Sequence, residues 1–183
     1  SAGFDRATLT ALSRESGLQR ASLYHLFPGG KAEMAKAVID HSNIAFASAV
    51  LSTLEGSPPP RQRFGDMVES INRYYKSGRE ACLLGSFALE MPSDEFGAAI
   101  RAGFLRWIEL LSRVFLEAGL PAGECHIRAR EVVAMIQGAL VVSRGIESKS
   151  VFAELLRRLP ARAFDSLPPA EPSIVTQRRR RTA

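Results

Sequence analysis

Apolar side chains recur along this chain at intervals of three and four residues. Phe64, Val68, Ile71 and Tyr75 form one such stripe. Two further stripes have the same spacing: Phe96, Ile100, Phe104, Trp107 or Ile108, Leu111 and Phe115, and then Val132 or Val133, Ile136 and Leu140. This spacing places the side chains on one face of an α-helix, whereas the clean alternation that indicates strands is scarce. The pattern therefore predicts an all-α protein.

Turn-forming residues divide this pattern into helices. Glycine and proline interrupt it near residues 17, 28–30, 56–60, 78, 91–93, 119–121 and 145, and such residues commonly end helices. We expect the main helices over residues 8–15, 19–27, 31–56, 94–119, 124–145 and 149–159. Ser93 is expected to cap the helix that begins at Asp94. This organisation predicts a head (1–40), a larger helical body (41–159) and a flexible Pro/Arg-rich tail (160–183).

Composition and charge narrow the class of protein. Of the 183 residues, 46% are hydrophobic and 23% are charged, which is typical of a globular protein with a buried core. No apolar run approaches about 18 residues, so we expect no contact with a membrane. The two cysteines, Cys82 and Cys125, favour free thiols and a cytoplasmic location. The net charge is +5, and +3 of it falls within residues 160–183, so charge alone is weak evidence for nucleic-acid binding.

The head contains the most informative spacing. Thr8 can cap a short helix, Gly17 supplies a left-handed residue for a tight turn, and a second short helix follows. Such a pair is typical of a helix-turn-helix, whose second helix lies in the major groove of DNA. Helical proteins that do not bind DNA also contain such pairs, so the spacing alone leaves both interpretations open.

Outward-facing side chains of the second helix suit contacts with DNA. Arg20 can donate to guanine edges, Ser22 can contact a base or a phosphate, and Tyr24 can bind a phosphate. Lys31 begins the next helix, where its ammonium group and the helix N-terminus both favour a phosphate.

The order of residues in the head is more specific than its spacing. It includes Ala7-Thr8-Leu9, Leu12, Ser16-Gly17-Leu18 and, over residues 23–34, Leu-Tyr-His-Leu-Phe-Pro-Gly-Gly-Lys-Ala-Glu-Met. This order resembles the DNA-binding domain of the TetR family of transcriptional repressors, in the branch with a Phe-Pro-Gly-Gly-Lys turn. The resemblance implies a homodimeric all-α repressor that binds a palindromic operator and a small-molecule effector. The DNA contacts that it implies are Thr8, Gln19, Arg20, Ala21, Ser22, Tyr24, His25 and Lys31.

The chain departs from this family in two places. Members have a further helix ahead of the position of Gly3, so we expect this sequence to be a fragment of a longer protein whose first helix is not included. Leu26 stands where the family often has a polar residue, commonly His. We therefore expect one DNA contact to be lost or to be replaced by His25.

The resemblance also implies a ligand cavity among the middle helices. The lining residues expected there are Met67, Ile71, Tyr74, Tyr75, Phe87, Met91, Phe104, Trp107, Ile108, Met135 and Gln137. Such a lining favours an apolar or aromatic ligand that is neutral or mildly polar. The alternative is that these side chains are ordinary core.

The cysteines offer two further hypotheses. Cys82 lies in a segment, Ala-Cys-Leu-Leu-Gly, that looks like a TetR subgroup in which some members sense electrophiles through a cysteine. A pKa lowered by Arg79 or by a helix N-terminus would support that role, but a small buried hydrophobic residue is the favoured interpretation. Cys125 and His126 are adjacent and lack further ligands nearby, so we expect neither a metal nor another cofactor.

The last two body helices are expected to form the dimer interface. Their apolar faces contain Val132, Val133, Ile136, Ala139, Leu140, Phe152, Leu155 and Leu156. A palindromic operator requires a two-fold dimer, because its half-sites mirror the symmetry of the protein. The alternative is that these residues close the core of the monomer. The four-arginine run at residues 178–181 could add nonspecific phosphate contacts.

Other function classes find less support. The sequence has no Gly-x-Ser-x-Gly elbow, phosphate-binding glycine loop, His-Glu-x-x-His motif or dinucleotide fingerprint, so we do not expect an enzyme. The remaining alternative is a helical protein-interaction or small-molecule-binding module without sequence-specific DNA binding.

Overall fold

The part of the chain that the structure describes is folded into helices. The computed structural model describes residues 8–90 and 93–167, in which no strand is present. The helices are α2 (Leu9–Ser16), α3 (Arg20–Leu26), α4 (Gly30–Ala49), the short 3₁₀ helix η1 (Leu51–Leu54), α5 (Pro60–Tyr74), α6 (Leu83–Glu90), α7 (Ser93–Glu117), α8 (Ala122–Gly145) and α9 (Ser150–Ala163). The predicted all-α fold class is therefore confirmed.

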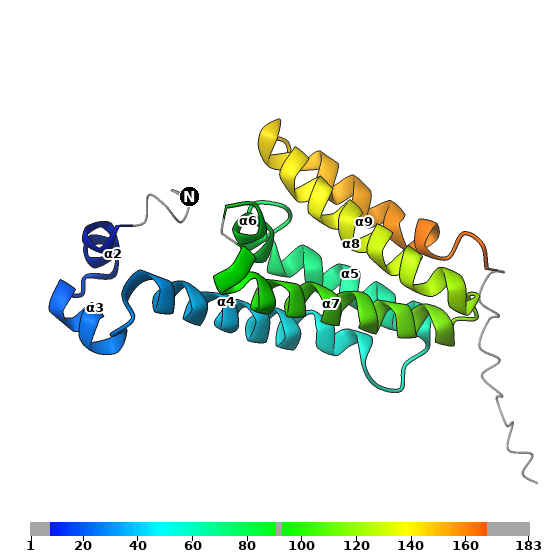
Figure 1. Cartoon of the computed structure of the whole chain (residues 1–183). Coiled ribbons are helices and arrows are strands. Elements are labelled where there is room, and N and C mark those ends of the chain that lie inside the picture. The colour runs from blue at the N-terminus through cyan, green and yellow to red at the C-terminus, as the bar shows by residue number, and fades with distance from the viewer. Residues whose placement is uncertain (1–7, 91–92, 168–183) are drawn as a thin grey trace, which may run out of the picture.

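Helices α2 and α3 form the head, which lies at one end of the long helix α4 (Figure 1). The Oγ1 of Thr8 accepts a hydrogen bond from the amide of Ala11 at 3.2 Å, so Thr8 caps α2 as expected. Gly17 has a φ of 70°, a left-handed conformation that glycine adopts without the steric cost of a Cβ. Leu23 of α3 is buried. The head is thus a helix pair joined by a tight turn.

A glycine turn joins the head to α4. Gly30 has a φ of 68°, and the amide of Gly29 donates to the Glu33 carboxylate at 2.8 Å. Helix α4 then continues without a break past residue 40, where we expect the head to end. A rotation of α4 within the body will therefore carry the head with it. The proposed division into residues 1–40, 41–159 and 160–183 stays a prediction.

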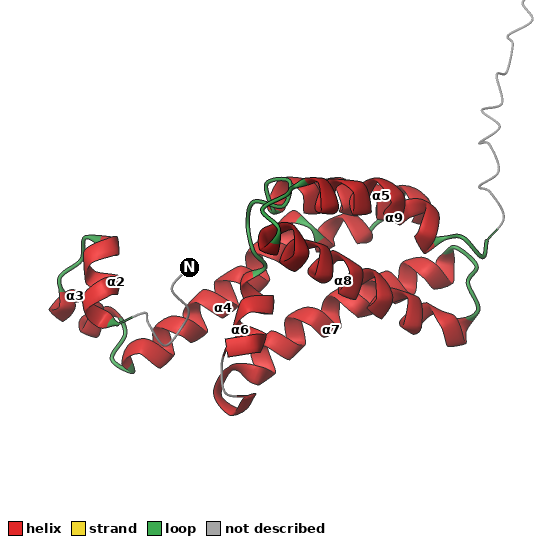
Figure 2. Ribbon diagram, turned by 90° about the horizontal axis from the view of Figure 1, so that it is seen from above, coloured by secondary structure: helices red, strands yellow, loops and turns green. Residues whose placement is uncertain are grey.

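Helices α4 to α9 form the body (Figure 2). The main core lies among η1, α5, α7, α8 and α9, and its largest fully buried side chains include Phe64, Trp107, Phe115 and Phe152. A second cluster of buried residues, which includes Ile39, Leu84, Phe96 and Ile100, lies where α4, α6 and α7 meet. The apolar stripes of the sequence form most of both clusters, because burying them removes apolar surface from water.

Two helix ends differ from the predicted ends by more than two residues. The helix that begins near Lys31 ends at Ala49 and continues as η1, in which Leu51 and Leu54 are buried. Helix α9 continues through Pro160 to Ala163, although a proline inside a helix removes one hydrogen bond. The guanidinium of Arg128 donates to the carbonyl of Arg162 and to Asp165, at 2.7 and 2.6 Å, and so holds this last turn.

Among residues 8–90 and 93–167, no helix is both long enough and apolar enough to cross a lipid bilayer.

Candidate functional site

The solvent-facing side of α3 carries the side chains expected to bind DNA. Arg20, Ala21, Ser22 and His25 are exposed, and 47% of the Tyr24 surface is accessible. Gln19 precedes the helix as its N-cap residue and makes no capping bond through its side chain. Leu26 is 57% exposed, so this unexpected apolar residue also lies on the surface. The polar side chains of α3 are therefore available to a partner.

Two other candidate phosphate contacts flank α3. Thr8 is exposed, although its hydroxyl oxygen already accepts the Ala11 amide. Lys31 is half-buried in the first turn of α4. The Gly29 amide at this helix start donates to the Glu33 carboxylate. One of the backbone donors that could bind a phosphate therefore already has a partner within the chain.

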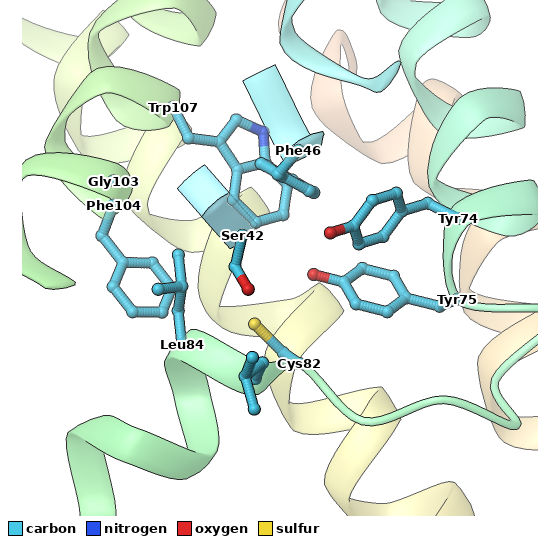
Figure 3. Close-up of a pocket in the computed structure, with 10 residues that line it drawn as sticks. Ser42, Phe46, Tyr74, Tyr75, Cys82, Leu84, Gly103, Phe104 and Trp107 are labelled. Atoms are coloured by element: carbon cyan, nitrogen blue, oxygen red, sulfur yellow. The ribbon is translucent and has the colours of Figure 1, made fainter. Parts of the chain in front are cut away.

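A small cavity lies in the body where four segments converge (Figure 3). Its volume is about 20 Å³, and it is lined by Ser42 and Phe46 of α4, Tyr74 and Tyr75 at the end of α5, Cys82, Leu83 and Leu84 around the start of α6, and Gly103, Phe104 and Trp107 of α7. The hydroxyls of Ser42, Tyr74 and Tyr75 and the thiol of Cys82 point toward one another. The cavity therefore combines aromatic walls with a cluster of uncharged polar groups.

Aromatic packing and burial define the chemistry of these walls. Phe46 meets Trp107 edge to face with ring centres 4.9 Å apart, and Tyr74 in the same way at 5.3 Å. Burial raises the pKa of Tyr75 far above its ordinary value, and the neighbouring Cys82 raises it further. Burial also raises the pKa of Tyr74. Both phenols are therefore neutral at physiological pH and can donate hydrogen bonds to a ligand.

A larger groove lies beside this cavity, between α6 and α8. Its volume is about 400 Å³, and Cys82 and Phe104 line both spaces. The other lining residues are Ala81, Gly85, Ser86, Ala88 and Leu89 from the α6 region and Gln137, Gly138, Leu140, Val141 and Arg144 from α8. The Nε2 of Gln137 is buried, and a hydrogen bond between Gln137 and Tyr75 lowers the pKa of that phenol, although the effect of burial is larger.

The predicted pocket residues divide into two groups. Tyr74, Tyr75, Phe104 and Trp107 line the cavity, and Gln137 lines the groove with Phe104. Met67 and Ile71 are fully buried and belong to the main core instead, where the indole of Trp107 donates to the Met67 sulfur at 3.5 Å. Ile108 and Met135 pack against the main core and Phe87 against the second cluster, and Met91 lies outside the described residues.

The side chains predicted for the dimer interface lie mostly inside the single chain. Seven of these residues, Val132, Val133, Ile136, Ala139, Leu140, Phe152 and Leu156, are buried within the single chain, and Leu155 packs against the same core. Their side chains close the core of the monomer, which was the alternative interpretation. A dimer that uses α8 and α9 must therefore form through the opposite faces of these helices.

The two cysteines lie in different surroundings. Cys82 is half-buried, and its sulfur accepts the amide of Gly85 at 3.4 Å at the start of α6. Cys125 is buried, and its thiol donates to the carbonyl of Pro121 at 3.3 Å. Burial raises the pKa of Cys125, which makes a structural role the natural one. Within the described residues, no group of three or more His, Cys, Asp or Glu side chains could hold a metal ion.

Comparison with known proteins decides the family. Residues 60–157, more than half of the chain, match the C-terminal domain of LmrA/YxaF-like transcriptional regulators, a TetR-family domain. The chain belongs to the TetR family of transcriptional regulators. This TetR-family chain is 24% identical to an HTH-type transcriptional regulator of Mycobacterium tuberculosis in an alignment of 150 residues that covers 75% of each protein. It is 21% identical to the HTH-type transcriptional regulator LmrA of Bacillus subtilis in an alignment of 145 residues that covers 77% of each protein.

A solved structure supports the same fold. A TetR transcriptional regulator from Legionella pneumophila superposes with a TM-score of 0.76 and 20% identity, covering 87% of each chain. The comparisons therefore identify a helical DNA-binding regulator rather than an enzyme. Members of this family bind DNA operators, dimerise and respond to small-molecule effectors.

Proposed function

We propose that this regulator is a homodimeric repressor, which binds a palindromic operator through α3 and leaves it when a small apolar or aromatic ligand binds in the body. The exposed polar face of α3 in the helix-turn-helix of a TetR-family chain carries the proposal. Arg20, Ala21 and Ser22 are placed to meet base edges, whereas Thr8, Tyr24, His25 and Lys31 would hold phosphates.

The size of the inner cavity suggests how a ligand acts. At about 20 Å³ it has room for little more than a water molecule, whereas pockets for drug-sized ligands are commonly about 300–1,000 Å³. A ligand that enters it must therefore displace part of the lining, which includes the α4 wall formed by Ser42 and Phe46. Because α4 continues to the head, displacing that wall changes the position of α3. A ligand that binds better to the displaced state shifts the population toward it.

The dimer interface is proposed on the exposed sides of α8 and α9. Ile127, Ala134, Gly138, Val141 and Gly145 form an exposed stripe along α8 at intervals of seven, four, three and four residues. We name this set the outer stripe. The exposed residues of α9 include Ala153, Glu154, Arg157, Arg158 and Ala161. Small residues in the outer stripe allow the close approach of a second helix.

The branch with a Phe-Pro-Gly-Gly-Lys turn remains part of this proposal. Its second glycine corresponds to Gly30, whose positive φ favours glycine at this place. A Cβ on Gly29 would lie 3.2 Å from the Glu33 side chain, which limits that position as well. The arginine run at residues 178–181 lies outside the described residues, and a role in phosphate binding stays a prediction.

The experiment that tests the proposal is selection of random duplex DNA by the full-length protein at near-physiological salt. The expected result is enrichment of a palindrome. We expect Tyr24→Ala and Lys31→Ala to weaken binding to all sequences, and Arg20→Ala to cost about 1–3 kcal/mol and to relax base preference at one position. Arg101→Ala, at an exposed arginine of α7, is the matched control and is expected to change neither.

Two results would overturn this assignment. Unchanged affinity in all three head variants would show that α3 is not the recognition helix. Failure of the folded, dimeric protein to enrich any sequence would favour a helical interaction or ligand-binding module without sequence-specific DNA binding. Once an operator is known, compounds can be screened by the fluorescence of Trp107, the single tryptophan of the chain, because this side chain lines the cavity.

A further inference from the structure

The groove between α6 and α8 is apolar along most of its length. Ala81, Ala88 and Leu89 line it from the α6 side, and Leu140 and Val141 line it from α8. Leu89 is 84% exposed and Val141 is 64% exposed, so part of this apolar lining faces water. The groove volume of about 400 Å³ lies within the range of about 300–1,000 Å³ that is common for ligand pockets. A ligand with an elongated apolar body would bury this surface.

The polar groups at the inner end of the groove already have partners within the chain. The Cys82 thiol and the Gln137 amide both form hydrogen bonds with Tyr75, and the thiol points toward that phenol (Figure 3). The Cys82 sulfur also accepts the amide of Gly85. A charged group of a ligand would lose its water at this end without gaining a free partner. The inner end therefore suits the apolar part of a ligand.

The guanidinium of Arg144 is the only charged group among the described residues that line the groove. Arg144 is exposed in the last turn of α8, where a cation also interacts favourably with the helix dipole. It follows Gln137 by seven residues, so the two side chains leave the same side of α8 about 10 Å apart along the helix axis. The groove thus has a paired amide near its inner end and a cation two turns away.

The carboxylates near Arg144 do not neutralise it. A hydrogen bond from Lys76 and the charge of Lys76 lower the pKa of Glu80, and Arg144 adds a smaller effect. The Nζ of Lys76 lies 2.9 Å from the Glu80 carboxylate, so this acid already has a cation as its partner. Glu147 follows Arg144 by three residues. Neither it nor any other acidic side chain in residues 8–90 and 93–167 forms an ion pair with Arg144.

We propose that the groove binds an elongated apolar carboxylate, with its anionic head on the Arg144 guanidinium and its apolar body extending toward Phe104 and Cys82. This assignment rests on the ligand-responsive function proposed above and names the chemical class of the effector. A guanidinium can donate two parallel hydrogen bonds to a carboxylate, which a neutral head group does not match. The sequence favoured a neutral or mildly polar ligand, because Arg144 was not among the expected lining residues.

Three probes with the same unbranched alkyl chain separate the effect of the head group from that of the apolar body. Decanoate is anionic, decanol is neutral and decylamine is cationic at neutral pH. Calorimetry with the full-length protein, below the concentrations at which the probes form micelles, measures each Kd. Decanoate should bind about five- to tenfold more tightly than decanol, because its head group is paired but partly exposed. Decylamine should bind most weakly, and added salt should reduce the preference for decanoate.

Substitutions at Arg144 test the position of the head group. Arg144→Gln removes the charge, Arg144→Lys keeps it without the parallel pair of donors, and Arg130→Gln is the matched control at an exposed arginine of α8 outside the groove. The ratio of decanoate to decanol affinity is compared within each variant, so a general loss of binding cancels. We expect a ratio near one in Arg144→Gln, an intermediate ratio in Arg144→Lys and the wild-type ratio in Arg130→Gln. A wild-type ratio near one, or a preference that persists in Arg144→Gln, would overturn the proposal.

Alkylation of Cys82 locates the bound probe without any substitution at Arg144. The chain has two cysteines, and the second, Cys125, is buried. Decanoate at ten times its Kd should slow the reaction of Cys82 with N-ethylmaleimide to roughly one tenth of the free rate. Cys82→Ala measures the contribution of Cys125. Binding of decanoate that leaves the Cys82 rate unchanged would place it elsewhere and overturn the proposal.

Failure of this proposal can be distinguished from failure of the proposed function. If the protein enriches a palindrome but binds none of the three probes, or binds all three equally, the assignment of an apolar carboxylate is wrong and the DNA-binding function stands. If decanoate binds at Arg144 and protects Cys82 while no DNA sequence is enriched, the groove assignment is confirmed and the operator-binding function is wrong.

Discussion

The contact between α4 and α7 at Gly103 leads to a sharp stability prediction. A Cβ on Gly103 would overlap the Oδ1 of Asn43 and lie 3.0 Å from the Leu84 Cδ1. The Nδ2 of Asn43 donates to the carbonyl of Ala99 at 3.0 Å, which ties α4 to α7. Gly103→Ala must therefore displace the Asn43 side chain or separate the two helices.

The size of the effect follows from three contributions. Overpacking a close contact costs about 1–3 kcal/mol, and losing the Asn43 hydrogen bond costs about 1 kcal/mol. Replacing glycine by alanine inside a helix by itself stabilises the folded state by about 1 kcal/mol. We expect Gly103→Ala to lower the free energy of unfolding by about 1–3 kcal/mol. Gly65→Ala, in α5, meets no atom within 4 Å and should raise it by up to about 1 kcal/mol.

Urea denaturation followed by circular dichroism measures these changes. All variants are compared at one protein concentration, because the stability of a dimer depends on it. Asn43→Ala removes the atom that the new Cβ would meet, so Gly103→Ala should cost at least about 1 kcal/mol less in that background. If Gly103→Ala instead stabilises the protein as much as Gly65→Ala, α4 and α7 do not approach as closely as we describe, and the reasoning fails.

Two further predictions concern ion pairs at the end of the body far from the head. Glu117→Ala leaves the buried guanidinium of Arg63 without its carboxylate partner, and should lower the free energy of unfolding by about 2–4 kcal/mol. Arg63→Met should lower the free energy of unfolding by less than Glu117→Ala, because it removes the buried charge itself. A larger loss for Arg63→Met than for Glu117→Ala in urea denaturation would contradict this. Hydrogen bonding to Arg128 lowers the pKa of Asp165 below its ordinary 3.8, so this pair stabilises the fold above about pH 4 and loses that effect as the pH falls through the lowered value. Asp165→Asn should therefore flatten the acid side of the stability profile, measured by thermal unfolding between pH 2 and 6, and an unchanged profile would count against the pair.

Helix spacing predicted the body because burial follows it closely. Phe64, Val68, Ile71 and Tyr75 are all buried on one side of α5 and its last turn, as their spacing indicated. The end of α4 was harder to predict, because neither glycine nor proline marks the change to η1. The end of α9 was predicted too early, since Pro160 is a strong local signal that Arg128 and the buried Leu159 and Ala163 override.

The candidate sites were predictable to different degrees. The exposed face of the head could be predicted from the sequence, because α3 is short and Leu23 is its buried residue, which leaves its polar side chains exposed. The residues that line the cavity could be predicted only in part, because Ser42, Cys82 and Gly103 come from separate segments and follow no regular spacing along the chain. The dimer face is hard to assign from the sequence, because α8 has apolar residues on both sides. Val132 and Val133 face the core, whereas Val141 is exposed, so apolar spacing could not separate the two faces.

Helix α4 connects the two candidate sites, and its contacts suggest how they communicate. Its first turn lies beside the head, Asn43 holds it to α7, and Ser42 and Phe46 form one wall of the cavity. Because Asn43 lies next to Ser42 in the sequence, a ligand that displaces this wall acts directly on the bond between α4 and α7. The Oδ1 of Asn43 is buried without a partner, so this contact is incompletely satisfied. Helices α4 and α7 are also held by the second cluster of buried residues, so the Asn43 contact is the polar part of this junction and the part that a displaced cavity wall would alter first.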